Sequence, residues 1–209
     1  MESIVLFGAG SPVIVDVEET CRRLGLRVAA VVRNVAAADQ CGEPALVVAL
    51  AAMPAGLLAH GVAVPLFTPA NRRAALAEAI AHGAARFPPL LDPTAILPAR
   101  LAVAEGVYVN AGCTLGAAGR LGRFAFVNRG CVLGHHLELE AFASLGPGVV
   151  AAGQVMVGEA ALVGAGAVLA PGVRIGAGAV VCAGAVVLRN VAAGAMVAGN
   201  PARLVPGKV

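Results

Sequence analysis

From Leu91 onward, an aliphatic residue recurs at every sixth position of the chain without a change of phase. A period of six matches neither the 3.6 residues of a helix nor the 2 of a strand. It matches the hexapeptide repeat of a parallel β-helix, in which three hexads form one triangular coil. The seventeen positions are Leu91, Leu97, Val103, Val109, Leu115, Leu121, Val127, Leu133, Leu139, Leu145, Ala151, Val157, Val163, Leu169, Ile175, Val181 and Val187.

The positions between these aliphatic residues support the same fold. The fourth residue after the aliphatic one is mostly small, which leaves room inside each corner, and glycine often follows the aliphatic residue directly. We expect this glycine to tolerate the backbone conformation of the corner. The repeat therefore predicts a β-helix domain over residues 89–209, with its aliphatic residues pointing inward.

Residues 1–88 show a different pattern, in which apolar runs alternate with amphipathic ones. Ser11 and Pro12 are placed to begin a first helix, which runs to Arg23, as N-cap and first helical residue. Such alternation predicts a small parallel α/β domain. The expected strands span 4–7, 27–32, 45–50 and 62–67, and a second helix spans 71–82.

Composition narrows the class of protein. Hydrophobic residues make up 59% of the chain and charged residues 13%, which excludes a disordered chain. Residues 141–158 carry no charge and are long enough to span a membrane, but glycines and a proline interrupt them, so we expect interior β-structure and no membrane insertion. The net charge of +3 is too weak for nucleic-acid binding. Without a signal-peptide pattern, a reduced cytoplasmic protein is the simplest interpretation.

A glycine-rich turn, Gly8-Ala9-Gly10, lies between the first strand and the first helix. Such a turn lets a phosphate approach the helix N-terminus. The third glycine of a dinucleotide fingerprint is replaced by Val13, and the second strand ends at Arg33-Asn34 where an NAD site has an acid. Two interpretations stay open: a tight turn that binds nothing, or a site for a nucleotide diphosphate.

His135 and His136 are the histidines of the repeat, and both fall outside its inward positions. Residues 18 apart stack at the spacing of neighbouring strands. This places Ala117 below His135 and Gly153 above it, so the imidazole lies among small side chains where a substrate can approach. Histidine is the usual general base near neutral pH. The alternative is a pair of exposed histidines without a function.

Two further pairs stack one coil apart. Asn110 and Asn128 predict a structural asparagine ladder, and Cys113 and Cys131 predict packed thiols instead of a disulfide. No third ligand lies at metal-like spacing from the two histidines, so we expect no metal site within one chain. A metal-dependent enzyme that uses histidines from two subunits is a further alternative.

The segment from Asn128 through His135 and His136 to Gly148, together with the ending Val197-Ala-Gly-Asn-Pro-Ala-Arg203, resembles the hexapeptide-repeat sugar acyltransferases. The resemblance is to the branch that contains sialic acid O-acetyltransferases and N-acetyltransferases of nucleotide-linked 4-amino-dideoxy sugars. It covers essentially the whole chain. It implies a small Rossmann-like domain before a left-handed β-helix, a homotrimer with sites between adjacent β-helices, and acetyl-CoA as donor.

The resemblance also implies roles for individual residues. His135 matches the catalytic base, and His136 stands beside it where the family usually has an acid. Ser144, which many members replace with a second histidine, Gly153, Ala165 and Ala183 match contacts to the CoA thiol arm, and Arg203 lies in the tail that closes over the cofactor. The positions matching the nucleotide-sugar site are Gly8, Gly10, Ser11, Arg33 and Asn34, and they depart from the family's usual residues at Ser11-Pro12 and Arg33-Asn34.

The leading hypothesis is therefore an acetyl-CoA-dependent acyltransferase that acetylates an amino group of a nucleotide-linked sugar, with His135 as general base. Sugar O-acetylation is the nearest alternative, because the same base serves a hydroxyl. A β-helix that binds a nucleotide sugar or organises a complex without catalysis is the alternative from another class, and it is motivated by His136 in place of an acid.

Overall fold

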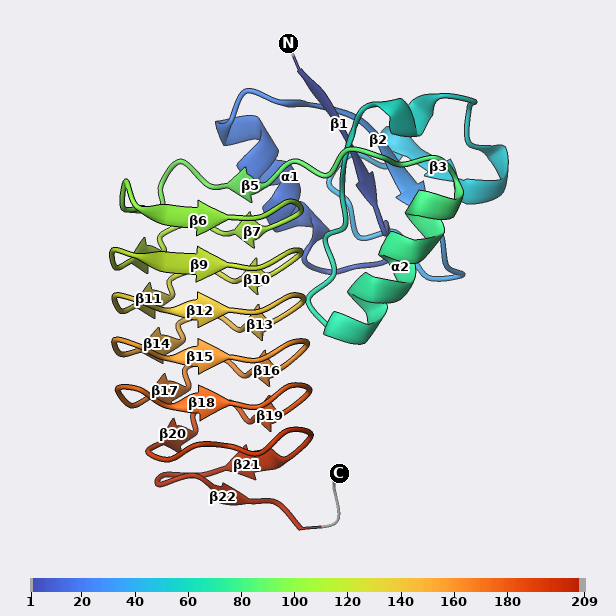
Figure 1. Cartoon of the computed structure of the whole chain (residues 1–209). Helices are drawn as coiled ribbons and strands as arrows, with labels where there is room; N and C mark the ends of the chain where they lie inside the picture. The colour runs from blue at the N-terminus through green and yellow to red at the C-terminus, as the bar shows by residue number, and fades with distance from the viewer. Residues whose placement is uncertain (1, 207–209) are drawn as a thin grey trace. The chain divides into compact units, whose positions relative to one another are not determined.

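A computed structural model of the chain describes residues 2–206, and the chain divides into two compact units between Pro93 and Thr94. The first unit contains a parallel sheet in the order β3-β2-β1-β4, with two helices (Figure 1). The strands of this sheet are β1 (Ser3–Phe7), β2 (Arg27–Arg33), β3 (Val47–Ala49) and β4 (Gly61–Ala63). The short β5 (Leu90–Leu91) of the first unit lies outside this sheet.

The third and fourth strands of this sheet are shorter than the sequence predicts. Two 3₁₀ turns, Pro44–Leu46 and Leu50–Ala52, flank β3, and β4 ends at Ala63 instead of reaching residue 67. Pro65 lacks the N–H that a strand interior requires, which explains the early end of β4. The chain that follows β4 is therefore loop, and it forms one wall of a cavity described below.

The two helices are α1 (Ile14–Arg23) and α2 (Pro69–Ala81). The predicted cap at Ser11 is wrong: α1 begins at Ile14, Val13 is its N-cap, and no side chain caps it. The Ser11 hydroxyl instead donates to the Pro65 carbonyl oxygen at 2.5 Å. This bond joins the glycine-rich turn after β1 to the loop after β4.

The second unit is built from coils that stack on one another, and successive coils contribute strands to three sheets (Figure 1). We call them the charged sheet, the valine sheet and the third sheet. The charged sheet contains β6 (Leu101–Val103), β9 (Gly119–Leu121), β12 (Glu138–Leu139), β15 (Met156–Val157) and β18 (Arg174–Ile175). The valine sheet contains β8 (Thr114–Leu115), β11 (Val132–Leu133), β14 (Val150–Ala151), β17 (Val168–Leu169) and β20 (Val186–Val187). The third sheet contains β7 (Tyr108–Val109), β10 (Phe126–Val127), β13 (Ser144–Leu145), β16 (Leu162–Val163), β19 (Val180–Val181), β21 (Met196–Ala198) and the antiparallel β22 (Arg203–Leu204).

The 18-residue register of a hexapeptide β-helix is confirmed. Val127, for example, pairs with Val109 on one side and Leu145 on the other. Every aliphatic position of the series from Val109 to Val187 is buried, whereas Leu91, Leu97 and Val103 are only partly buried. Leu97 and Val103 belong to the first turn of the repeat, which has no earlier coil of its own kind to close over it.

At each corner, the residue with the left-handed backbone is not the glycine that the sequence predicted. From Gly106 to Gly184, the third residue after each aliphatic residue has a left-handed backbone, including His136 at φ +55°. The glycines that directly follow the aliphatic residue do not have positive φ. A Cβ on any of them would lie 2.4–2.8 Å from an atom of the next coil. These glycines are therefore required by the close approach of coils, and the expectation that they serve the corner conformation is wrong.

This difference predicts unequal costs for two glycine substitutions. Gly158→Ala places a Cβ 2.7 Å from the Ala177 backbone nitrogen, which cannot move without displacing the next coil. We expect a loss of about 3 kcal/mol in the free energy of unfolding. Gly166→Ala, where φ is +66° and no atom lies within 4 Å, should lose only about 1 kcal/mol. Denaturant unfolding of both variants measures this, and an equal loss would contradict the assignment.

Candidate active site

His135 and His136 lie at the corner between β11 of the valine sheet and β12 of the charged sheet, and both side chains are exposed. Their Nδ1 atoms are 3.0 Å apart, and their rings meet edge to face, with centroids 5.2 Å apart. Because two nitrogens share this hydrogen bond, one ring donates and the other accepts. If Nδ1 of His135 carries the proton, its Nε2 holds a lone pair that can accept a proton from a substrate.

The space around His135 is the one that the stacking predicted. The His136 amide donates to the Ala117 carbonyl one coil earlier, and the Gln154 amide donates to the His135 carbonyl one coil later. The His135 ring lies against Gly153: a Cβ at that position would be 2.6 Å from both Cε1 and Nε2. The absence of a side chain at Gly153 is thus what allows this placement of the imidazole.

The other residues predicted to contact CoA lie elsewhere on the β-helix. Ala165 and Ala183 are exposed and stack at the corner between the third sheet and the valine sheet. Ser144 begins β13 of the third sheet and is fully buried, and Arg203 is exposed on β22. Within one chain, the valine sheet separates the corner of His135 and Gly153 from the corner of Ala165 and Ala183.

A cavity of about 690 Å³ lies in the first unit, beyond the carboxyl ends of β1, β2 and β4. This edge is where parallel α/β sheets usually bind ligands. Gly8, Gly10, Ser11 and Asn34 line the cavity, as the nucleotide-sugar assignment requires. Arg33 does not line it: its guanidinium pairs with the Asp39 carboxylate, and this hydrogen bond lowers the pKa of Asp39.

The glycine-rich turn is shaped by packing as well as by access to the cavity. Gly8 has φ +123°, and a Cβ there would lie 2.8 Å from Cδ1 of Leu66. A Cβ on Gly10 would lie 2.9 Å from that of Ala37. The Gly8 and Ala9 amides both donate to the Val32 carbonyl, whereas no described backbone carbonyl accepts from the amides of Gly10 or Val13. The latter two amides are therefore candidate donors for a ligand in the cavity.

Sequence reasoning missed the wall of this cavity that α2 provides. Asn71, Ala74, Ala75 and Glu78 line it, at the spacing of one helix face. Nδ2 of Asn34 donates to Oε2 of Glu78 at 2.8 Å, so a residue after β2 holds a carboxylate from α2. The sequence shows an acid at position 78, but nothing in it indicates that Glu78 contacts Asn34.

A buried arginine supports the loop between β4 and α2. Nη1 of Arg72 donates to the carbonyl oxygens of Leu66 at 2.6 Å and Phe67 at 2.9 Å, both on residues that line the cavity. Burial lowers the pKa of Arg72 to about 9, and the nearby charge of Arg73 adds to the effect. Arg72 thereby fixes the apolar wall of the cavity from behind.

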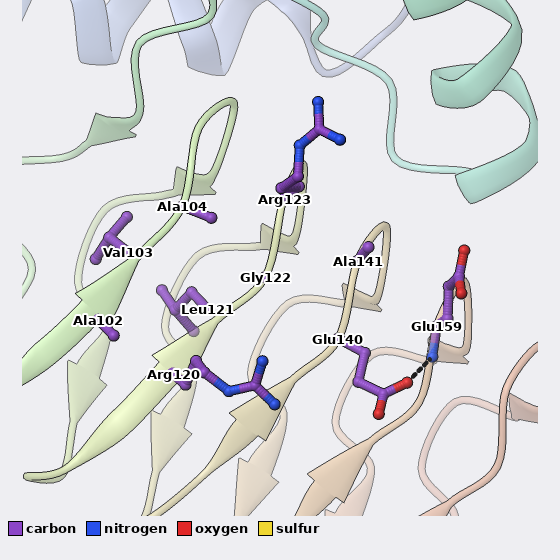
Figure 2. Close-up of a pocket in the computed structure, with 10 residues that line it drawn as sticks. All are labelled: Ala102, Val103, Ala104, Arg120, Leu121, Gly122, Arg123, Glu140, Ala141 and Glu159. Carbon is purple, nitrogen blue, oxygen red and sulfur yellow. Dashed lines mark hydrogen bonds between the residues drawn. The ribbon is translucent and has the colours of Figure 1, made fainter.

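Figure 2 shows a shallow groove on the charged sheet that contains none of the predicted site residues. Its charged groups already have partners: Arg120 pairs with Glu138 at 2.7 Å, Arg123 pairs with Glu105, and Glu140 accepts from the Glu159 amide at 2.9 Å. These bonds link successive coils, since most of them join residues 18 or 19 apart. The charged residues of the groove are therefore explained by the bonds that join successive coils.

The two stacked pairs have the structural roles that the sequence predicted. Nδ2 of Asn110 donates to Oδ1 of Asn128 at 3.1 Å, and each Oδ1 accepts the next backbone amide. Cys113 and Cys131 are buried thiols, and each donates to a backbone carbonyl. The hydrogen bond between the two thiols, together with burial, raises the pKa of the Cys131 thiol.

Residues 2–206 contain no group of three or more histidine, cysteine or acidic side chains that could hold a metal ion. No helix among them has the length and apolar run needed to cross a membrane.

Comparison with known proteins gives consistent matches to transferases. The family described as "Bacterial transferase hexapeptide (six repeats)" matches residues 154–189, and no curated protein matches the chain. PerB from Caulobacter crescentus, solved in complex with CoA and GDP-perosamine, is 31% identical, with a TM-score of 0.84 over 98% of this chain and 97% of that one.

Two further solved structures are similar. One is a histidine-to-alanine variant of GDP-perosamine N-acetyltransferase from Caulobacter crescentus in complex with CoA and GDP-perosamine, at 30% identity, a TM-score of 0.84 and coverage of 98% and 97%. The other is the acetyltransferase domain of PglB from Neisseria gonorrhoeae with acetyl-CoA, at 26% identity, a TM-score of 0.82 and coverage of 98% and 99%.

The placement of His135 against Gly153 can be tested without an assay. Gly153→Ala introduces a Cβ 2.6 Å from the imidazole, so we expect the ring to rotate away and the Nδ1–Nδ1 hydrogen bond to be lost. Nitrogen-15 NMR of the histidine rings should then show both tautomers of His135. Gly172→Ala, one coil further with no atom within 4 Å, is the control. Unchanged ring spectra in Gly153→Ala would refute the placement.

Proposed function

Because the chain belongs to the hexapeptide-repeat sugar acyltransferases and is itself an acyltransferase, we propose that it transfers the acetyl group of acetyl-CoA to an amino group of a nucleotide-linked 4-amino-dideoxy sugar. The observation that carries this proposal is the exposed His135 ring, hydrogen-bonded through Nδ1 to His136 and lying against Gly153. Acetyl-CoA and nucleotide sugars are cytoplasmic metabolites, so we infer that the enzyme acts in the cytoplasm.

His135 is the general base in this proposal. Nε2 takes a proton from the acceptor amine as the amine nitrogen bonds to the thioester carbonyl carbon. When the tetrahedral intermediate collapses, the carbon–sulfur bond breaks and the protonated His135 returns the proton to the CoA sulfur. No covalent enzyme intermediate is required, and backbone N–H groups near the acceptor can stabilise the developing oxyanion.

His136 has a limited but definite role in the same step. As a neutral acceptor at Nδ1, it keeps the His135 proton on Nδ1 and the lone pair on Nε2. A neutral neighbour stabilises the protonated base less than an acid does. The pair therefore orients the base more than it strengthens it.

The CoA contacts proposed for Gly153, Ala165, Ala183 and Arg203 favour a site between chains, whereas Ser144 is fully buried within one chain and offers CoA no exposed surface. One chain presents Gly153 and His135 on one corner and Ala165 and Ala183 on another, with the valine sheet between the corners. The corners of two copies can flank one acetyl-CoA if the copies pack near their valine sheets. The outward side chains of the valine sheet are apolar and partly exposed, as an interface between copies requires. Val132, Val150 and Val168 are 50%, 41% and 38% exposed. We propose a homotrimer built on this face.

The nucleotide sugar is assigned to the cavity of the first unit, which we interpret as a small Rossmann-like domain. The free amides of Gly10 and Val13 are its backbone donors for a diphosphate. Ser11 contributes only acceptor capacity, because its proton is donated to Pro65. Arg33 can assist only if it leaves Asp39. A similar structure that holds a GDP-linked sugar supports this choice of substrate.

Replacing His135 by Ala tests the reaction. Turnover should fall by about two to four orders of magnitude, because the general base is lost. Acetylation of nucleotide-linked amino and hydroxy sugars, assayed side by side, measures it and separates N- from O-acetylation. His60→Ala, an exposed histidine in the first unit, is the control. Full activity in His135→Ala would refute the proposed base, and no acetylation of any acceptor by the wild type would favour a non-catalytic role.

Replacing Val150 by Lys tests the assembly. A lysine on the valine sheet would put charge into each interface, so we expect the trimer to dissociate and acetylation to fall with it. Sedimentation velocity measures the change. Arg174→Gln on the charged sheet is the control and should leave the trimer intact. An intact Val150→Lys trimer would show that another face forms the interface.

A further inference from the structure

The cavity of the first unit has an unusual charge for a site that receives a diphosphate. Its lining, within residues 2–206, contains Glu78 as the one charged side chain and no lysine or arginine. A carboxylate repels phosphate, so Glu78 must face a part of the ligand that offers hydrogen-bond donors. The free amides of Gly10 and Val13, at the start of α1, are better placed to receive the phosphates.

The environment of Glu78 fixes the position of its carboxylate. The side chain is partly buried on the cavity face of α2, four residues beyond Ala74. Nδ2 of Asn34 donates to Oε2 at 2.8 Å, which orients the carboxylate. A carboxylate has about four lone-pair sites, so Oε1 and one site on Oε2 remain for a ligand. They accept hydrogen bonds and donate none.

The nucleobases differ in how they match two adjacent acceptors. Guanine presents N1–H and the N2 amino group side by side, so a carboxylate can bind both. Uracil presents a single N3–H between two carbonyl oxygens, which a carboxylate repels. Adenine and cytosine each present one amino group beside a ring acceptor. Among the four bases, guanine alone supplies two adjacent donors.

The apolar part of the lining suits a purine. Val35, Leu66 and Phe67 line the same cavity as Glu78, and Arg72 holds the Leu66–Phe67 segment from behind. A flat base can pack against these side chains while its donor edge meets the carboxylate. The cavity volume of about 690 Å³ is ample for a nucleotide.

We propose that Glu78, held by Asn34, determines the base of the sugar nucleotide and selects guanine. The inference rests on the proposed function, since it assumes that the cavity binds a nucleotide-linked sugar. It goes beyond that function because it names the base and the residue that recognises it. It also assigns Asn34 a positioning role instead of a direct contact.

Calorimetric titration of the full-length protein with GDP, UDP, CDP and ADP tests the proposal. GDP should bind at least about tenfold more tightly than the other three. In Glu78→Gln, GDP should lose roughly ten- to a hundredfold in affinity, because hydrogen bonds to a charged group are lost. UDP should bind to Glu78→Gln at least as tightly as it binds to the wild type. The reason is that a glutamine amide offers one acceptor to N3–H and one donor to a uracil carbonyl.

Glu43→Gln, an exposed carboxylate outside the cavity, is the matched control and should leave all four affinities unchanged. Asn34→Ala should weaken GDP in the same direction as Glu78→Gln, though less. If Glu78→Gln does not fold, the wild-type ratio of GDP to UDP affinity still decides the question.

Two outcomes would overturn the inference and leave the proposed function intact. One is a wild-type preference for UDP, CDP or ADP. The other is an equal loss for all four nucleotides in Glu78→Gln, which would place the carboxylate on the ribose hydroxyls. If no nucleotide binds at all, the nucleotide-sugar part of the proposed function fails as well.

Discussion

The close approach of successive coils is the constraint on which the second unit depends. At Gly116, Gly134, Gly158 and similar positions, the next coil lies where a Cβ would be. Such spacing leaves no freedom for a coil to slip along its neighbour, and the 18-residue register is kept through most of the repeat. Since register decides which side chain lies over which, the glycines indirectly place every functional group on the surface of the β-helix.

The same constraint determines the surroundings of His135. Register puts Gly153 beside its ring, and the left-handed corner at His136 turns the second imidazole so that the two Nδ1 atoms meet. A left-handed backbone is uncommon for a residue other than glycine, although histidine tolerates it better than most. The exposed His135 imidazole is therefore oriented by backbone geometry and by one hydrogen bond to a second imidazole.

The two units contribute opposite kinds of surface. The β-helix offers the proposed base on one corner and small side chains on another, separated by an apolar sheet face, so the proposed site is complete only in an assembly. The first unit offers a single carboxylate among apolar walls, with backbone amides as its donors. The surfaces proposed for the acyl donor and the acceptor thus differ in charge and in construction.

The sequence alone determined the β-helix, because a strict period of six over seventeen positions is compatible with one kind of coil. The same period determined that Ala117, His135 and Gly153 stack in successive coils. It also predicted the asparagine ladder and the buried thiols, which follow from the same register. Only the tertiary structure decided which predicted residues are occupied elsewhere, as Ser11 is by Pro65 and Arg33 by Asp39, and which unpredicted residue faces the cavity. The physical reason is that a repeat encodes its own contacts at fixed spacing. The meeting of Asn34 with Glu78 joins segments 44 residues apart through a fold without such a period.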